Sequence, residues 1–198
     1  RVQEAGLSNL YRSISSLGVP YVFVAGNHDR SAVDDTQLLD DLAGTDGVTL
    51  LEPGSGEYQQ IEVGGLRIAG FNDPRYYGDA DDGSTDEQVA ARERWVEALG
   101  DAEPPDITVS HEEPALEDAP GRLRVHGHGH VPQVSGNRLQ VGTFTGGGTL
   151  SHFVGGPDAE LVGHQLEVLR NVTREIGRVV GVDGDLDALI GQLLDALG

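Results

Sequence analysis

The chain has 198 residues, which is enough for one domain with a sizeable hydrophobic core. Its 33 acidic and 13 basic residues give a formal net charge of −20, which disfavours long nucleic acids and anionic membrane surfaces as partners. The absence of cysteine excludes disulfides and thiolate metal sites, and no apolar run approaches the ~20 residues of a membrane span.

The first part of the chain predicts helices that alternate with strands. Apolar residues at helical spacing favour a helix over 2–17, and the apolar run over 20–25 predicts a buried strand. A second helix is expected to begin at Ser31, where Ser31 and Asp34 resemble a capping pair, and to end near Gly44. Its inner face would consist of Val33, Leu38, Leu39 and Leu42. Further strands are expected over 47–51, 57–63 and 65–71, with a hairpin turn at Gly64-Gly65.

The rest of the chain predicts more strands and two more helices. A long acidic and aromatic loop over 72–85 leads into a helix at about 85–99, and loops of this length are often functional or disordered. Strands are expected over 106–110, 122–126, 132–136 and 138–144, with a short polar connection after the first of them. The tail predicts a hairpin over 164–171 and 175–182, followed by an amphipathic helix over 183–198. Because no domain boundary is visible, we interpret 1–198 as a single domain.

Three of the predicted strands end in side chains of the kind that bind metal ions. These are Asn27-His28-Asp29 after the first strand, His111 after the strand over 106–110, and His128 and His130 after the strand over 122–126. Parallel neighbours in one sheet would bring such ends together. Imidazole and amide oxygen suit Zn, Mn or Fe. Each stretch alone could be an exposed histidine or a capping turn, but four of the seven histidines fall at these ends.

Together the three stretches resemble the motifs of the calcineurin-like metallophosphoesterases. Gly26-Asn27-His28-Asp29 resembles the Gly-Asn-His-Asp/Glu motif of that family, Ser110-His111 its single-histidine motif, and Gly127-His128-Gly129-His130 its Gly-His-x-His motif. The resemblance covers roughly residues 1–170. It implies an α/β fold, a four-layer αββα sandwich of two mixed sheets that here lacks its first strands. Residues 1–198 would then form one metallophosphoesterase domain, truncated at its N-terminus.

The resemblance also implies a role for each site residue. Asn27, His111 and His128 would hold one divalent ion, and His130 would hold a second. His28 would lie beside the phosphate as the catalytic general acid or transition-state stabiliser. The two ions would be Mn, Fe or Zn. On the long loop, Arg75 and Tyr76 are candidate substrate contacts, and a packed Asp-Pro turn is an equally good interpretation of that segment.

Two motifs of the family are missing upstream of Gly26. Asp-x-His and Gly-Asp-x-x-Asp should precede it, but the residues before Gly26 predict only a helix and a strand. A literal match at residues 78–82 follows the third expected motif in a loop, so we do not assign it to the site. We therefore expect an upstream segment of the same protein to supply the missing ligands. The 198 residues alone should hydrolyse little substrate.

The sequence thus predicts a metal-dependent hydrolase of phosphomonoesters or phosphodiesters, in which a dinuclear site activates a water for in-line attack. The alternative is a non-catalytic metal-binding or regulatory module derived from the same fold. The residues that precede Arg1 would distinguish the two. The expected partners are a small phosphorylated substrate and the upstream segment, without long nucleic acid or membrane contact. The compartment is unknown, and the cytoplasm is only the default for a fragment in which neither cysteine nor a signal peptide is visible.

Overall fold

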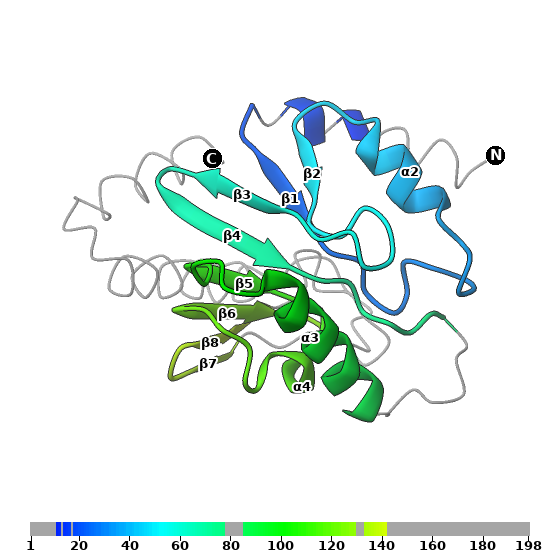
Figure 1. The fold of residues 1–198 in the computed structure, drawn as a ribbon. Coiled ribbons are helices and arrows are strands. Elements are labelled where there is room, and N and C mark those ends of the chain that lie inside the picture. Colours follow the sequence, from blue (N-terminus) through cyan, green and yellow to red (C-terminus); the bar gives the residue numbers. More distant parts are fainter. Residues whose placement is uncertain (1–10, 13, 17, 78–84, 130–132, 142–198) are drawn as a thin grey trace, which may run out of the picture.

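The computed structural model describes residues 11–12, 14–16, 18–77, 85–129 and 133–141 (Figure 1). Within these residues the chain is an α/β structure with one six-stranded mixed sheet and one two-stranded sheet. The predicted tail hairpin, the helix over 183–198 and the start of the first helix lie outside the described residues. None of the helices in the described part has the length and apolarity needed to cross a lipid bilayer.

The six-stranded sheet contains four parallel strands at its centre. Its order is β3-β4-β5-β6-β8-β7, and the two edge strands run antiparallel to their neighbours. The strands are β3 (Gln60–Val63), β4 (Leu66–Gly70), β5 (Ile107–Val109), β6 (Leu123–His126), β7 (Gln133–Ser135) and β8 (Arg138–Gln140). All six were predicted, although each is shorter than expected. Gly64 and Gly65 have φ of 59° and 80°. This confirms the hairpin turn between β3 and β4, because a two-residue turn of type I′ needs positive φ at both residues.

The two-stranded sheet belongs to a strand, helix, strand unit at the start of the described chain. β1 (Tyr21–Phe23) pairs in parallel with β2 (Val48–Leu50), and α2 (Gln37–Ala43) connects them. Both strands were predicted. A small core holds the unit together, and its buried members are Ile14, Ala25, Leu39, Leu42 and Leu50.

The start of α2 differs from the prediction. The backbone N–H and the hydroxyl of Ser31 both donate to Asp35 Oδ2, at 2.9 and 2.5 Å. The polar side chains therefore close a local turn here, and the helix begins only at Gln37. Val33 is 73% exposed, so the prediction that it lies on the inner face of the helix was wrong.

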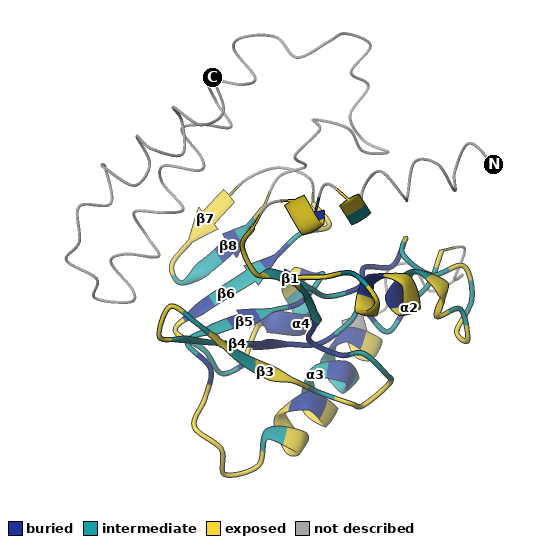
Figure 2. Ribbon diagram, turned by 90° about the horizontal axis from the view of Figure 1, so that it is seen from above, coloured by how far each residue is buried: buried dark blue, intermediate teal, exposed yellow. Residues whose placement is uncertain are grey.

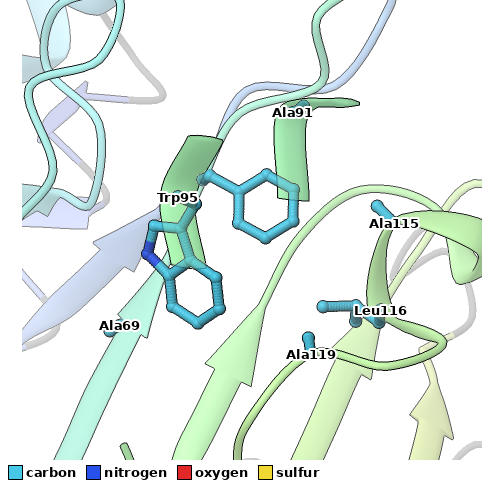
Figure 3. Packing of buried hydrophobic residues seen from close by; sticks show 7 residues of the cluster. Ala69, Ala91, Trp95, Ala115, Leu116 and Ala119 are labelled. Carbon is cyan, nitrogen blue, oxygen red and sulfur yellow. The ribbon is translucent and has the colours of Figure 1, made fainter. Parts of the chain in front are cut away.

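Two helices cover one face of the six-stranded sheet. α3 (Thr85–Leu99) was predicted, whereas α4 (Glu113–Leu116) lies where a polar connection was expected. The proline in the first turn of α4 suits a helix start, because its missing N–H would have no partner there. Both helices contribute to one hydrophobic core, which consists of Ala69, Phe71, Ala91, Trp95, Ala115, Leu116 and Ala119 (Figure 3). By contrast, edge strand β7 is exposed along its length (Figure 2).

The two sheets meet where β1 and β4 end. Ala25 N–H donates to Asn72 Oδ1 at 2.7 Å, and Asp73 N–H donates to the Ala25 carbonyl at 2.8 Å. Asn72 N–H in turn donates to the buried Glu52 at 2.7 Å, and the Asn72 amide donates to the Glu52 carbonyl. These bonds fix the residues after β1 beside the residues after β2 and β4.

Candidate functional site

The candidate site lies at the carboxyl ends of β1, β4, β5 and β6. β5 and β6 are parallel neighbours, and their pairing continues past the strands: Ser110 N–H donates to the Val125 carbonyl and Gly127 N–H to the His111 carbonyl, at 3.1 and 3.0 Å. The bonds between Ala25 and the 72–73 segment bring the end of β1 to the same edge. The fold therefore gathers the three predicted strand ends, but parallel pairing in one sheet joins only those of β5 and β6. β1 belongs to the two-stranded sheet, so the expectation that all three strands are neighbours in one sheet was wrong.

His111 occupies the centre of the site. Its Nε2 lies 3.0 Å from Asn27 Oδ1 and 3.1 Å from His128 Nδ1. The His111 and His128 rings meet edge to face, with centroids 5.1 Å apart. His111 thus contacts two of the other predicted metal ligands, and the three residues come from three different strand ends.

The backbone at His128 adopts an uncommon conformation that turns the ring toward His111. Its φ is 55°, and His128 is the only described residue besides glycines with a positive φ. Gly129 N–H donates to the Gly127 carbonyl at 2.7 Å across it. Such a conformation costs roughly 1–3 kcal/mol and persists only where surrounding contacts hold it, often at functional sites.

Gly26 allows His111 to approach the end of β1. A Cβ on this residue would lie 2.7 Å from both Cε1 and Nδ1 of the His111 ring. Only a residue without a side chain leaves the ring where it stands. The glycine that precedes Asn27 is therefore part of the site geometry.

A buried network of charged residues supports the second histidine. Glu112 Oε1 lies 3.2 Å from His128 Nε2 and also accepts a hydrogen bond from Arg75. Arg75 is 1% exposed and pairs with the fully buried Asp73 at 3.0 Å. Gln88 donates to Asp73 at 2.8 Å. Asp73 and Glu112 were not predicted as site residues. Each follows a predicted strand within three residues, and this position is the signal that could have identified them.

Burial keeps His111 neutral at physiological pH. Desolvation lowers its pKa to about 4, and the nearby His128 and Arg75 act in the same direction, while Asp73 opposes them. A neutral imidazole can offer a ring nitrogen lone pair to a cation. Burial also raises the pKa of Asp29, although its bond from Gly26 N–H, 2.7 Å long, partly offsets this effect.

The remaining predicted site residues surround this cluster or lie outside the description. His28 is exposed, and its ring stands edge to face with Tyr77 at 5.0 Å between centroids. Tyr76 is half-buried, and its contact with substrate stays a prediction. Arg75 is 1% exposed between two carboxylates, so it has almost no surface with which to contact a substrate. His130 lies outside the described residues, and its role as the ligand of a second ion also stays a prediction.

The donor set fits a divalent cation. Two ligands bound to one ion at about 2.0–2.2 Å lie about 3 Å apart when their bonds are near a right angle, and both contacts of His111 Nε2 have this length. One amide oxygen and two imidazole nitrogens suit Mn, Fe or Zn. In the described ranges no three His, Cys, Asp or Glu side chains gather as a cation site, and the third donor of this cluster is the Asn27 amide.

The Asp73 carboxylate should make stability depend on pH in the acid range. Burial alone would raise the pKa of Asp73, but hydrogen bonds from Arg75 and Gln88 outweigh burial and lower it. A lowered folded pKa stabilises the fold above the unfolded value of about 3.9, and this contribution is lost as the pH falls through that value toward the folded pKa.

We therefore expect the difference in unfolding free energy between wild type and Asp73→Asn to stay constant from about pH 7 to about pH 5 and to shrink below about pH 4. Urea unfolding at each pH measures it. A difference that grows as the pH falls would contradict the assignment of Asp73 as a buried, stabilising anion.

Comparison of the chain with models of known protein families, with curated proteins and with solved structures finds no match.

Proposed function

We propose that this chain carries the metal-binding part of a hydrolase of phosphomonoesters or phosphodiesters, with the four-layer αββα arrangement of the calcineurin-like metallophosphoesterases. The observation that supports it is the contact of His111 Nε2 with both Asn27 Oδ1 and His128 Nδ1. These are the residues that correspond to the ligands of one ion in the family. They are far apart in the sequence, so the presence of the motifs alone does not require the three side chains to meet.

The proposed cofactor is a pair of divalent ions, Mn, Fe or Zn. Asn27, His111 and His128 would hold one ion. His130 would hold the other, together with ligands from an upstream segment of the same protein. When bound, the ions would supply the Lewis acidity that polarises phosphate oxygens and lowers the pKa of an attacking water.

The chain's own residues would bind the substrate and handle protons. With a net charge of −20, the protein repels anions, so a phosphorylated substrate has to be small enough to reach the cation site without crossing an acidic surface. His28 is exposed beside the ligand Asn27, where it could donate a proton to the leaving oxygen. Tyr76 remains a proposed substrate contact on the loop that follows β4, whereas the buried Arg75 would act on the site through Glu112.

The alternative function is a non-catalytic metal-binding or regulatory module. It is favoured by the ligand set itself: among the described residues, the donors that touch His111 Nε2 are an amide and an imidazole, and neither is a carboxylate that could bridge two ions. In such a module the chain would hold one ion and no substrate.

Hydrolysis assays distinguish the two functions. With Mn²⁺ present, we expect the chain together with its upstream segment to hydrolyse p-nitrophenyl phosphate or its bis ester, and the 198 residues alone to hydrolyse little. His28→Ala should reduce kcat by about 100-fold or more, as loss of a general acid does, while Mn²⁺ binding persists.

A suitable control is Asn137→Ala, since Asn137 is a hairpin residue whose carbonyl, rather than its side chain, bonds Arg124. It should leave the rate unchanged, whereas Asn27→Ala should abolish it. If the extended protein binds Mn²⁺ but hydrolyses neither ester, the binding module becomes the better proposal. If it binds none of Mn²⁺, Fe²⁺ and Zn²⁺, both proposals fail.

A further inference from the structure

Glu112 stands between a proposed cation ligand and a buried arginine. Its carboxylate contacts His128 Nε2 at 3.2 Å on one side and accepts a hydrogen bond from Arg75 on the other. We propose that Glu112 is a positioning residue, which Arg75 anchors and which holds His128 with its Nδ1 directed at the cation site. This proposal rests on the proposed function, because it concerns the same site.

The first step follows from the hydrogen-bonding capacity of the two groups. A carboxylate only accepts hydrogen bonds, so the atom that faces Glu112, His128 Nε2, carries the hydrogen. A neutral imidazole has a single N–H, which leaves a lone pair on Nδ1. Nδ1 is the atom that lies 3.1 Å from His111 Nε2. Glu112 therefore selects the tautomer whose lone pair points into the ligand cluster.

The second step is the anchoring of Glu112 itself. Its side chain is 12% exposed, and Arg75, which is 1% exposed, also binds Asp73. Glu112 directly precedes α4 and has extended backbone, with φ of −118° and ψ of 153°. The helix start and the arginine together hold the carboxylate in place. The fixed carboxylate can then keep the His128 ring in place, although the positive φ of His128 is unfavourable.

Charge supports the same role. Two carboxylates and one guanidinium leave this buried network with a net charge of −1 beside the ligand cluster, which favours a cation there. The same negative charge disfavours contact between Glu112 and a phosphate. Glu112 therefore acts through His128 and does not touch substrate.

The test compares Glu112→Ala with Glu113→Ala, a substitution of the same residue type one position later. Glu113 pairs with Arg138 at 3.0 Å and makes no contact with His128 that we observe. Imidazole ¹⁵N chemical shifts of the metal-free chain report the tautomer. We expect His128 to carry its hydrogen on Nε2 in the wild type and in Glu113→Ala. In Glu112→Ala both tautomers should be populated.

The second readout is Mn²⁺ affinity measured by calorimetry. Loss of a residue that orients a ligand typically weakens metal binding by about 10–100-fold, and we expect Glu112→Ala to fall in this range while Glu113→Ala matches the wild type. Glu112→Gln keeps the shape and an acceptor oxygen. It should retain most of the Nε2–H tautomer and of the affinity. If the alanine variant does not fold, Glu112→Leu, which fills a similar space without an acceptor, serves as the test variant and should populate both tautomers.

Several results would overturn the proposal. One is a His128 that keeps its hydrogen on Nε2 alone when Glu112 is replaced by alanine or leucine, and another is a wild-type His128 with its hydrogen on Nδ1. A loss of affinity in Glu113→Ala equal to that in Glu112→Ala would show a general charge effect instead of positioning. If the wild type binds no Mn²⁺ but Glu112→Ala still changes the tautomer, the cation site fails and the positioning of His128 stands.

Discussion

Gly26→Ala is expected to weaken Mn²⁺ binding by about 10-fold or more while the chain stays folded. The new methyl group would lie 2.7 Å from two atoms of the His111 ring, so the ring has to move. His111 is the residue that touches both other ligands, and its displacement separates all three donors. Calorimetric titration of the 198-residue chain with Mn²⁺ measures the loss, and circular dichroism confirms the fold.

Gly127→Ala is the matched control for this prediction. A Cβ there would lie 3.8 Å from His111 Nδ1, which is ordinary van der Waals contact with the same ring. Its affinity should stay within about 3-fold of the wild type, because such a contact requires no movement. If Gly26→Ala and Gly127→Ala bind Mn²⁺ equally well, His111 does not hold the ion in the observed position.

Arg75→Met should lower the free energy of unfolding by about 3–5 kcal/mol, the usual cost of breaking a buried ion pair by removing one partner. Arg75 is 1% exposed, and its removal leaves the fully buried Asp73 and the mostly buried Glu112 without their counterion. Gln88 still donates to Asp73, but one neutral amide does not replace a guanidinium. The midpoint of urea unfolding measures the change.

Arg138→Met removes a comparable but exposed ion pair. Arg138 and Glu113 lie 3.0 Å apart with side chains 32% and 54% exposed, so this substitution should cost less than about 1 kcal/mol. If Arg75→Met leaves too little folded protein to measure, Arg75→Lys replaces it as the test variant. Lysine retains the positive charge but cannot make both guanidinium hydrogen bonds to Asp73. A cost for either Arg75 variant no larger than that of Arg138→Met would contradict the structural role of the buried network.

Local patterns predicted most of the secondary structure, and they failed where side chains compete with the helix backbone. Alternating and continuous apolar runs located all eight strands of the described residues. The predicted helix cap at Ser31 was wrong, because Ser31 hydrogen-bonds to Asp35 in a turn that precedes the helix. The residue types alone do not show whether Ser31 caps a helix or closes such a turn. The short α4 was missed because Glu112-Glu113-Pro114 reads as polar, although the following Ala115 and Leu116 are fully buried.

The amino-acid sequence by itself determined which residue types stand at the strand ends: Asn27 after β1, His111 after β5 and His128 after β6. Only the tertiary structure decided that they touch. Parallel pairing of β5 and β6 brings His111 to His128, whereas Asn27, 84 positions before His111, reaches them through the bonds that join the end of β1 to Asn72 and Asp73. It also decided the roles of Glu112 and Arg75, whose partners lie on other segments of the chain. A hydrogen bond between distant residues depends on the packing of the sheet between them, and no local pattern encodes that packing.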